Sequence, residues 1–296
     1  MNQRRCQSIQ ITVADERALL RKEQISMEQA EGRAWSKKGD AFGTITKMTR
    51  LLQQPKDDEF ELIYKEQRYQ PFWHVVSTAH YVYDRTSSYS VAISGAEVQS
   101  VSIEGAEHQA EGGSITFSAL DHCVEEARQE VFVEGISGDT DPALGEYLKY
   151  SAATISEEAL DTFAPEGTIV VPPQARSSAI VREVLAGMIK SVQADRIVEE
   201  RVEVERVDLY YRPVYAFQYR WLAKSKEAIM ECDALTGKLH VGGKTFQQHL
   251  GKVLDAEFLF DVGVDAVDLL VPGGGIAIKV ARKGIDVARS RSKKGA

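Results

Sequence analysis

Histidine and cysteine are the side chains that most often bind metal ions or act as nucleophiles, and the chain has six histidines and three cysteines. His74 and His80 are six residues apart in an expected strand, so about 20 Å separates them along it. One metal ion does not bridge that distance. The zinc motifs Cys-x-x-Cys and His-Glu-x-x-His are absent from the sequence. The sequence therefore predicts no metal centre.

Cys123 next to His122 is the arrangement closest to a thiol nucleophile with its base. We expect a helix over 118–132, and adjacent side chains on a helix diverge by about 100°, so the two would not face one cleft. The carboxylates of Glu125 and Glu126 would also disfavour a reactive thiolate. We therefore expect no catalytic residue here.

Glycine-containing stretches that resemble phosphate-binding loops occur at 135–139, 240–246 and 271–279. Gly-Gly-Lys-Thr at 242–245 matches the end of such a loop, but Lys238 stands where the motif requires its first glycine. The three glycines at 273–275 precede an expected helix, whose N-terminus is able to bind an anion. A plain turn explains them better, and we predict no cofactor.

Composition places the chain among ordinary globular proteins. Its 296 residues allow roughly two domains, and 43% apolar with 27% charged residues permit a packed core. The formal net charge of −8 argues against nucleic-acid binding by the whole surface, which needs cations to meet phosphates. Three widely spaced cysteines favour a reducing cytosol over a disulfide framework. The sequence shows neither a secretory signal nor an uncharged apolar run of membrane-spanning length, which also favours the cytosol.

One short pattern occurs twice. Tyr-Gln-Pro-Phe-Trp-His-Val at 69–75 returns as Tyr-Arg-Pro-Val-Tyr-Ala-Phe at 211–217, 142 positions later. Proline has no N–H to donate to a neighbouring strand, so we expect Pro71 and Pro213 at the start or at a bulge of a long strand. The alternating aromatic side chains around them are typical of a sheet face that packs against a helix.

The same offset aligns the surrounding elements. With this offset, an expected helix at 42–52 aligns with residues 184–194, and alternating strands at 60–103 align with residues 202–241. Each copy then reads helix, strand, proline-containing strand, turn, strand, turn, strand, with the first turn of the first copy at 84–88. We interpret this agreement as an internal duplication in which the two copies share one strand order.

The segments outside the two copies have different patterns. We expect a strand at 8–13 and a helix within 15–35 before the first copy. Between the copies, we expect the helix at 118–132 and shorter helical runs at 143–150 and 156–163. The connecting segment is therefore predicted to be mostly helical.

The end of the second copy resembles a known family. The stretch at 226–243, a strand followed by Asp-Ala-Leu-Thr-Gly and a second short strand, is similar to the strand–turn–strand end of PepSY-type modules. The residues that match are Asp233, Thr236 and Gly237, which are also ordinary turn formers. The resemblance covers about 202–244. It implies a small helix-on-sheet module used in binding or inhibition, usually exported or membrane-tethered.

The C-terminal segment at 256–296 combines apolar and charged stripes. Asp261, Asp265 and Asp268 recur at helical spacing, and Pro272 with the following glycines would end that helix. A second helix with one basic side would follow, giving a helical hairpin. We expect this hairpin to mediate self-association or complex assembly, or to dock on an anionic membrane surface. Its candidate interaction residues are Phe258, Val262, Leu269, Leu270, Ile278, Lys279, Arg282, Lys283, Ile285 and Arg289.

Together these patterns predict an α+β protein of two related helix-on-antiparallel-sheet modules, with a helical insert and a C-terminal helical hairpin. Trp73 and Trp221 are expected in or beside the two helix–sheet cores. The expected segments are an N-terminal strand and helices at 1–55, a first repeat at 56–110, an insert at 111–175, a second repeat at 176–247 and a hairpin with a basic tail at 248–296.

Three classes of function remain open. The leading one is a non-catalytic cytosolic binding or assembly protein, a subunit or scaffold that binds a protein partner or a second copy. The alternative is a peripheral membrane protein that acts through the C-terminal hairpin. The third is an enzyme, which would need a pocket lined by four residues of one expected strand, His74, His80, Tyr81 and Tyr83.

Overall fold

The computed structural model describes residues 9–43, 56–160, 162–243 and 279–283. Most of these residues lie in strands of one large mixed sheet on which helices pack, and this confirms the predicted α+β class. The main path through the sheet is β11-β10-β9-β3-β6-β5-β4. Its strands are β3 (Phe60–Ala92), β4 (Ser100–Ile103), β5 (Ala106–Glu111), β6 (Ser114–Glu134), β9 (Arg196–Trp221), β10 (Lys226–Asp233) and β11 (Leu239–Val241).

The other described elements flank this path. The remaining strands are β1 (Gln10–Ala14), β2 (Glu16–Arg21), β7 (Ala152–Ile155), β8 (Thr168–Val170) and β12 (Lys279–Lys283). The α-helices are α1 (Met27–Ser36) and α3 (Ser177–Met188). The 3-10 helices are η1 (Lys38–Phe42), η2 (Asp57–Glu59), η3 (Pro142–Lys149), η4 (Glu157–Ala159) and η5 (Leu222–Lys224).

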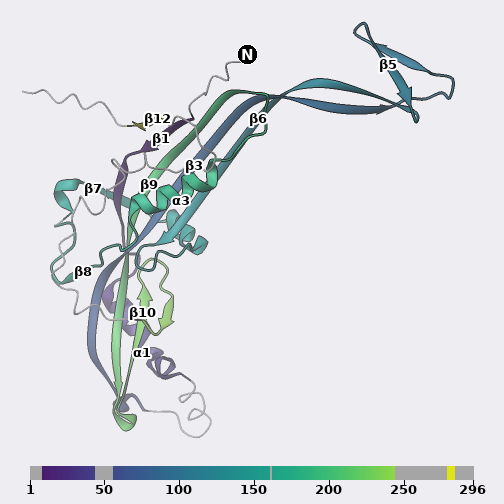
Figure 1. The fold of residues 1–296 in the computed structure, drawn as a ribbon. Helices are drawn as coiled ribbons and strands as arrows, with labels where there is room; N and C mark the ends of the chain where they lie inside the picture. The colour runs from purple at the N-terminus through teal and green to yellow at the C-terminus, as the bar shows by residue number, and fades with distance from the viewer. Residues whose placement is uncertain (1–8, 44–55, 161, 244–278, 284–296) are drawn as a thin grey trace, which may run out of the picture.

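β3 and β9 form the spine of the fold. They have 33 and 26 residues and pair antiparallel from Phe60 to Asp84 of β3. Gln70 lies opposite Arg212, and the ladder skips Ile63 on β3 and Glu205 and Val198 on β9, which are therefore bulge residues. Figure 1 shows the two strands running side by side through the whole body.

Pro71 and Pro213 lie within the two spine strands, at points where the ladders on their outer sides break. The carbonyl oxygen of Pro71 accepts a hydrogen bond from the N–H of Gly135 (3.0 Å), and that of Pro213 accepts one from Ala234 (3.1 Å). The β3–β6 and β9–β10 ladders end one residue away from the prolines. A missing N–H is tolerated at such a break. The prediction that each proline lies at the start or at a bulge of a long strand is therefore wrong, because each lies inside one.

Short strands occupy the rest of the outer edges of the spine. β8 lies parallel to β3 at 67–69, and β2 lies parallel to β9 at 207–211. β1 continues beside β9 at 201–204 and also pairs with β12, while β2 pairs with β7. Both spine strands are therefore covered by other strands along most of the body.

α1 and α3 cover the same face of the sheet at opposite ends of the spine. Side chains alternate between the two faces of a strand, so odd-numbered residues of β9 from Leu209 to Trp221 share one face. α3 packs Leu185 into the cluster that contains Trp73 and Tyr211. α1 packs Ala30 and Ala34 into the cluster that contains Phe217. Helix-on-sheet packing of aromatic strands is therefore present in both halves.

The helix predicted within 15–35 begins later than expected. Ser26 caps α1, because its side chain accepts a hydrogen bond from the Gln29 N–H and the Gln29 side chain accepts one from the Ser26 N–H. The preceding residues form β2 instead, with Ala18 and Leu19 buried. Parallel pairing with β9 overrides the helical pattern there.

The two tryptophans lie where the sequence predicted. Trp73 is completely buried (0% exposed), and its indole N–H donates to the carbonyl of Ala175 at 2.9 Å. Trp221 is 2% exposed and stacks on Phe60 with 5.3 Å between ring centroids. The expectation that both tryptophans are core residues is confirmed.

The predicted helix at 118–132 and the predicted turn at 84–88 are both wrong. Residues 118–132 belong to β6, and residues 84–88 continue β3 without interruption. The predicted common strand order of 60–103 and 202–241 is also wrong, because 60–92 is one strand, whereas 202–241 contains the end of β9 followed by β10 and β11. β6 pairs with β3 residue by residue from Ser114 to Glu134, and this long-range pairing overrides local helical propensity. Between the copies the described helical elements are the short η3 and η4, so the predicted mostly helical insert is also wrong.

The expected helices at 42–52 and 256–296 lie outside the described residues, apart from Phe42 and Gly43 at the end of η1 and from Lys279–Lys283. Lys279–Lys283 form β12, which pairs parallel to β1. The prediction that Lys279, Arg282 and Lys283 belong to a helix is therefore wrong. A strand is favoured at this place because β1 has a free side opposite β9, and β12 completes its hydrogen bonding.

Replacing Trp73 or Trp221 with Ala should lower the free energy of unfolding by roughly 3–5 kcal/mol, because each change removes a large buried side chain. Chemical denaturation followed by circular dichroism measures the change. Leu222→Ala is the matched control, since Leu222 is 52% exposed and its truncation should be nearly neutral. Unchanged midpoints in both tryptophan variants would contradict this packing.

Candidate functional site

β3 and β6 continue beyond the body as a two-stranded ribbon, which we call the arm and define as residues 85–92 and 114–121. β9 begins opposite Asp84, at Arg196, so no described strand pairs with the outer edge of β3 beyond that residue. Figure 1 shows the arm leaving the body, with the β4–β5 hairpin at its tip. The arm is therefore a ribbon with open backbone edges.

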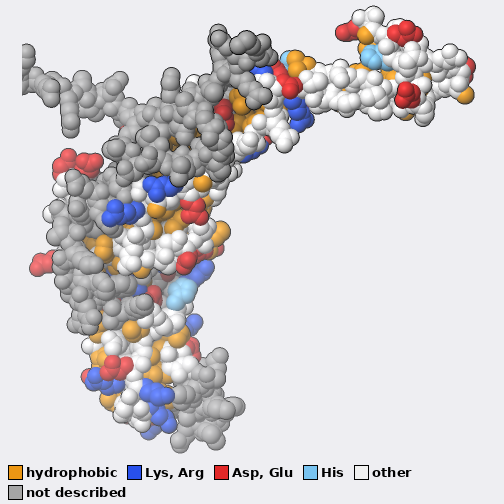
Figure 2. Space-filling model, in the orientation of Figure 1, with side chains coloured by type: hydrophobic (Ala, Val, Ile, Leu, Met, Phe, Trp, Pro, Cys, Tyr) orange, Lys and Arg blue, Asp and Glu red, His pale blue; other side chains and the backbone are white. Residues whose placement is uncertain are grey.

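The arm is also free of charge along most of its length. Residues 86–96 and 112–120 include no Asp, Glu, Lys or Arg, although 27% of the chain is charged. The part of β6 that lies on the body differs, since residues 121–130 include five charged side chains and one histidine. In Figure 2 the arm is mostly white, and red side chains gather at its tip. The tip acids are Glu97, Glu104, Glu107 and Glu111.

The two faces of the arm have different chemistry. One face has mainly apolar side chains, Tyr89, Val91, Ile115, Phe117 and Ala119, together with Ser87. The other has mainly hydroxyl side chains, Thr86, Ser88, Ser90, Thr116 and Ser118, together with the exposed Leu120. Tyr89 and Val91 are 43% and 48% exposed. The aromatic rings of Tyr89 and Phe117 stack at 6.1 Å. The apolar face is thus internally packed but still partly exposed to solvent.

Hydrogen bonds to two aspartates fix the base of the arm. Asp121 accepts hydrogen bonds from the hydroxyls of Ser87 (2.5 Å) and Tyr89 (2.6 Å), and these bonds hold the pKa of its carboxyl below the ordinary value. Asp195, next to the start of β9, accepts the backbone N–H of Thr86 at 2.6 Å. Asp121 belongs to the arm, so its bonds hold the two strands of the ribbon together, while the bond of Asp195 joins the arm to the segment that leads into β9.

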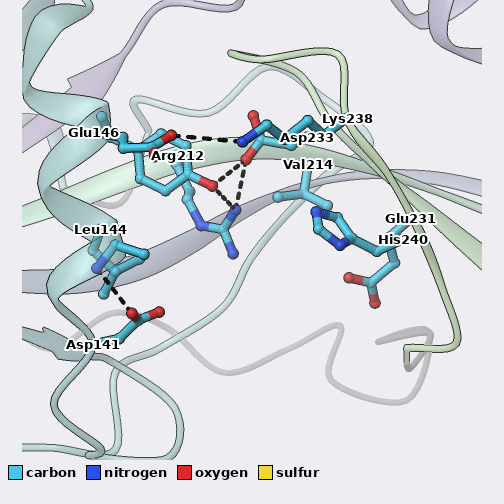
Figure 3. Close-up of a pocket in the computed structure, with 11 residues that line it drawn as sticks. Asp141, Leu144, Glu146, Arg212, Val214, Glu231, Asp233, Lys238 and His240 are labelled. Carbon is cyan, nitrogen blue, oxygen red and sulfur yellow. Dashed lines mark hydrogen bonds and ion pairs between the residues drawn. The ribbon is translucent and has the colours of Figure 1, made fainter.

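A polar cluster at the centre of the spine is the second candidate site (Figure 3). Arg212 donates to Gln70 Oε1 (2.8 Å) and to Asp233 Oδ2 (2.8 Å), and the Tyr147 hydroxyl donates to the same Asp233 oxygen at 2.6 Å. A cavity of about 350 Å³ adjoins these groups. η3, β9 and β10 meet at this cavity, each contributing one of the bonded side chains.

Asp233 also forms the turn after β10. Its Oδ1 accepts the backbone N–H groups of Leu235 (3.0 Å) and Thr236 (2.8 Å), and Gly237 has a φ of 72° that favours glycine. Burial alone would raise the pKa of Asp233, but the Tyr147 hydrogen bond and the charge of Arg212 outweigh it and hold that pKa below its ordinary value. Burial raises the pKa of the Tyr147 hydroxyl.

The chemistry of this cluster is that of a structural crosslink. Both oxygens of Asp233 are hydrogen-bonded, and none of the bonded groups is a nucleophile with a base beside it. The thiol of Cys232 next to Asp233 is buried, and burial raises its pKa to about 11. Within the described ranges, no three His, Cys, Asp or Glu side chains are grouped closely enough to hold a metal ion.

The pocket that would have favoured an enzyme is not assembled. The hydroxyl of Tyr81 donates to the carbonyl of Met188 at the end of α3 (2.8 Å), on the helix-covered face. His74 stacks on Phe132 with 4.6 Å between ring centroids, and burial lowers its pKa. His80 lies between Glu126 and Glu199 on the face opposite Tyr81. The hydrogen bond from Tyr83 to Glu125 raises the pKa of Tyr83 to about 12.

The interaction residues predicted in the C-terminal segment are not tested by these contacts. Phe258, Val262, Leu269, Leu270, Ile278, Ile285 and Arg289 lie outside the described residues, and Lys279, Arg282 and Lys283 lie in β12. None of the helices in the described part of the chain combines the length and apolarity needed to cross a bilayer.

Sequence reasoning missed the arm, although a signal for it was present. The two uncharged stretches, 86–96 and 112–120, are both rich in Ser, Thr and β-branched or aromatic residues and flank a short segment with a turn. Two such stretches with alternating polarity are typical of a hairpin. The turn expected at 84–88 concealed it, because a cluster of Asp and Ser side chains is typical of turns.

Asp233→Asn should destabilise the protein by roughly 1.5–3 kcal/mol, because Arg212 and Tyr147 would lose a charged acceptor. The pKa of Asp233 is lower in the folded state than the value of about 3.9 in an unfolded chain. Its stabilising effect is therefore complete above that unfolded value and is lost as the pH falls through the folded pKa. The variant should lose less stability than the wild type on acidification below about pH 4.

Denaturation midpoints measured across this pH range test the prediction. Glu146→Gln is the control, since the Glu146–Lys238 pair (3.6 Å) is exposed and contributes little. Equal acid sensitivity of the Asp233→Asn variant and the wild type would argue against a charged Asp233 at the centre of the cluster.

Comparisons with known proteins add no family to these observations. No protein-family model matches the chain, and neither a curated protein nor a solved structure matches it. The resemblance of 202–244 to PepSY-type modules therefore stays a prediction.

Proposed function

We propose that the chain is a non-catalytic assembly protein whose body presents the arm to a protein partner by strand pairing. This proposal rests on the edge of β3 from Ser87 to Ala92, which has no charged residue and no partner strand in the described chain. The N–H of Thr86, just before this edge, is already bonded to Asp195. The unpaired N–H and C=O groups of an edge strand are a template for another strand. Proteins usually block such edges with charged residues, proline or a bulge, and this stretch has none of them.

The stability of the arm also favours a partner. A two-stranded ribbon by itself is only marginally stable in water, and a third strand or a covered apolar face stabilises it. On the body, β9 supplies this third strand to β3. A partner strand on the arm would continue that pairing and would cover the exposed parts of Tyr89 and Val91.

The construction of the body suits a scaffold. β3 passes from the buried centre into the arm as one strand of 33 residues. At the centre, the bonds of Arg212 to Gln70 and Asp233 join β9 to β3 and β10. Movements of the arm are therefore opposed by the buried core and by the aspartates at its base. A cytosolic location, favoured by the cysteine content, is part of the proposal.

We propose further that the body arose by duplication, with copies that share one sheet. The β3–β9 register supports this, because it is symmetric about Gln70 and Arg212, which are 142 positions apart. The bulge residues Ile63 and Glu205 are separated by the same 142 positions. A local two-fold axis at the centre of the spine would relate the two copies.

The neighbours of the spine support the same symmetry. Each proline lies next to the end of an antiparallel ladder on the outer side of its strand. Pro71 lies next to the end of the β3–β6 ladder, and Pro213 next to the end of the β9–β10 ladder. Parallel strands lie before each proline, β8 at 67–69 and β2 at 207–211. α3, which precedes β9, packs over both β3 and β9, and α1, which precedes β3, packs over β9 and β10. Each half of the duplicated body therefore has a helix on the same face of the sheet.

Removing the arm tests the assembly function. In the armless variant a short glycine-containing turn joins Arg85 to Asp121, which are already paired across the ribbon. We expect the variant to keep the melting temperature of the full chain within a few degrees, because the described core clusters lie in the body. We also expect it to lose the proteins, including further copies of itself, that copurify with the tagged full chain.

Thr154→Lys is the control, because Thr154 is exposed on β7, away from the arm. It should retain the same copurifying proteins as the unmodified chain. An armless variant that folds and still retains the complete set would overturn the proposed role of the arm.

A further inference from the structure

We propose that the partner of the arm is a second copy of this chain, paired antiparallel along the outer edge of β3 from Arg85 to Ala92. The inference rests on the proposed assembly function and adds the identity of the partner and the strand that it uses. Three observations carry it: the edge that is open, the distribution of charge along the arm and the charges at its two ends.

The outer edge of β3 is the better of the two edges for pairing. The outer edge of β6 leads directly into the charged residues at 121–130, and at its other end β5 already pairs with it through Ala110 and Ile115. Charged residues on an edge oppose pairing. β3 is uncharged from Thr86 to the end of the strand, and in the described chain no strand pairs with the outer edge of that stretch, opposite β6.

The absence of charged residues along the arm favours a second copy of the chain as the partner over an unrelated protein. In a symmetric pair the same residues meet across the two-fold axis, so a charge near the axis would face an identical charge. The middle of the open edge is Ser88 and Tyr89, with no charged residue nearer than Arg85 on that strand. An unrelated partner is usually selected by complementary charges, and this part of the arm offers none.

The tip of the arm and its base differ in charge. The tip has four glutamates, at 97, 104, 107 and 111, while the base has the exposed Arg196 and an Arg85 that forms an ion pair with Asp121 (3.2 Å). The base carboxylates Asp121 and Asp195 already accept hydrogen bonds from the arm. When two arms pair antiparallel, each tip extends past the open edge of its partner to the place where β9 begins, at Arg196. Parallel arms would instead bring the acidic tips together.

The length of the open edge also reduces repulsion between the bodies. Each chain has a net charge of −8, so two bodies in direct contact would repel each other. The stretch from Arg85 to Ala92 is about 26 Å long as a strand, more than the Debye length of about 8 Å at physiological ionic strength. Antiparallel arms place the bodies at opposite ends of that stretch, where solvent ions screen their charges.

Light scattering on the full chain over a wide range of concentration is the first test. We expect a dimer that dissociates on dilution. Ser88→Lys puts a lysine beside the two-fold axis, and we expect the dissociation constant to rise about 10- to 100-fold from like-charge repulsion. Thr154→Lys is the matched control with the same added charge on an exposed strand, and it should dimerise like the wild type. A dimer that Ser88→Lys leaves unchanged would overturn the proposal.

Spin-label distances are the second test and do not depend on the lysine variant. Labels are placed at Ser88→Cys in mid-arm or at Ser102→Cys in the tip, with Cys6 and Cys123 replaced by serine. Cys232 stays, because it is buried and burial raises its pKa to about 11. We expect a short distance between the two copies for the mid-arm label and a long one for the tip label. The reverse order would show contact between tips and would overturn antiparallel pairing.

The tests also separate this inference from the function on which it rests. A full chain that is monomeric at every concentration, but still retains another protein only when the arm is present, would overturn self-pairing and leave the assembly function intact. A chain whose oligomeric state and copurifying proteins are both unaffected by removal of the arm would overturn both.

Discussion

The antiparallel pairing of β3 with β9 is the constraint on which the rest of the structure depends. Its central residues, Gln70 and Arg212, are 142 positions apart, and their side chains are joined by a hydrogen bond of 2.8 Å. Every outer strand on the body pairs with one of these two strands or with a strand that does. Because contacts so distant in sequence must form before the edges can be added, we expect folding to be slow for a chain of this size.

The arm follows from a difference in length between the two spine strands. β9 begins opposite Asp84, but β3 continues to Ala92 with β6 as its partner. The body therefore covers one part of β3 on both edges and leaves the other part covered on one edge only. The part of β3 in the body is paired on both edges because it forms the buried core. The second part contributes little to the core, and its lack of charged residues is the basis for the proposed contact with another chain.

Several features of the fold were predictable from local patterns. The repeated tyrosine–proline motif identified both spine strands, and the tryptophans were correctly placed in the core because aromatic side chains alternated around them. The turn at Asp233 followed from its Asp-x-x-Thr-Gly pattern. These predictions succeeded because the residues that decide each structure are close together in the sequence.

The arm was not predicted because its determinants are long-range. Leu120 and Val124 are four positions apart, a spacing that places two side chains on one face of a helix and equally on one face of a strand. In β6 they are 54% and 62% exposed, and the helix expected at 118–132 does not form. Their structure is decided by pairing with β3, which local spacing does not reveal. The polar cluster was missed for the same reason, since Tyr147 and Arg212 meet Asp233 only in the folded chain.

The most direct test of whether the arm pairs with a partner strand is hydrogen exchange of its backbone amides. The exchange is measured by mass spectrometry at low and at high protein concentration. In dilute solution, amides at 86–92 should exchange much faster than those at the centre of β3, because only one edge of the arm is paired. At high concentration they should become protected while the central amides stay unchanged. Strong protection of 86–92 at every dilution, or fast exchange at every concentration and with every copurifying protein, would contradict this account.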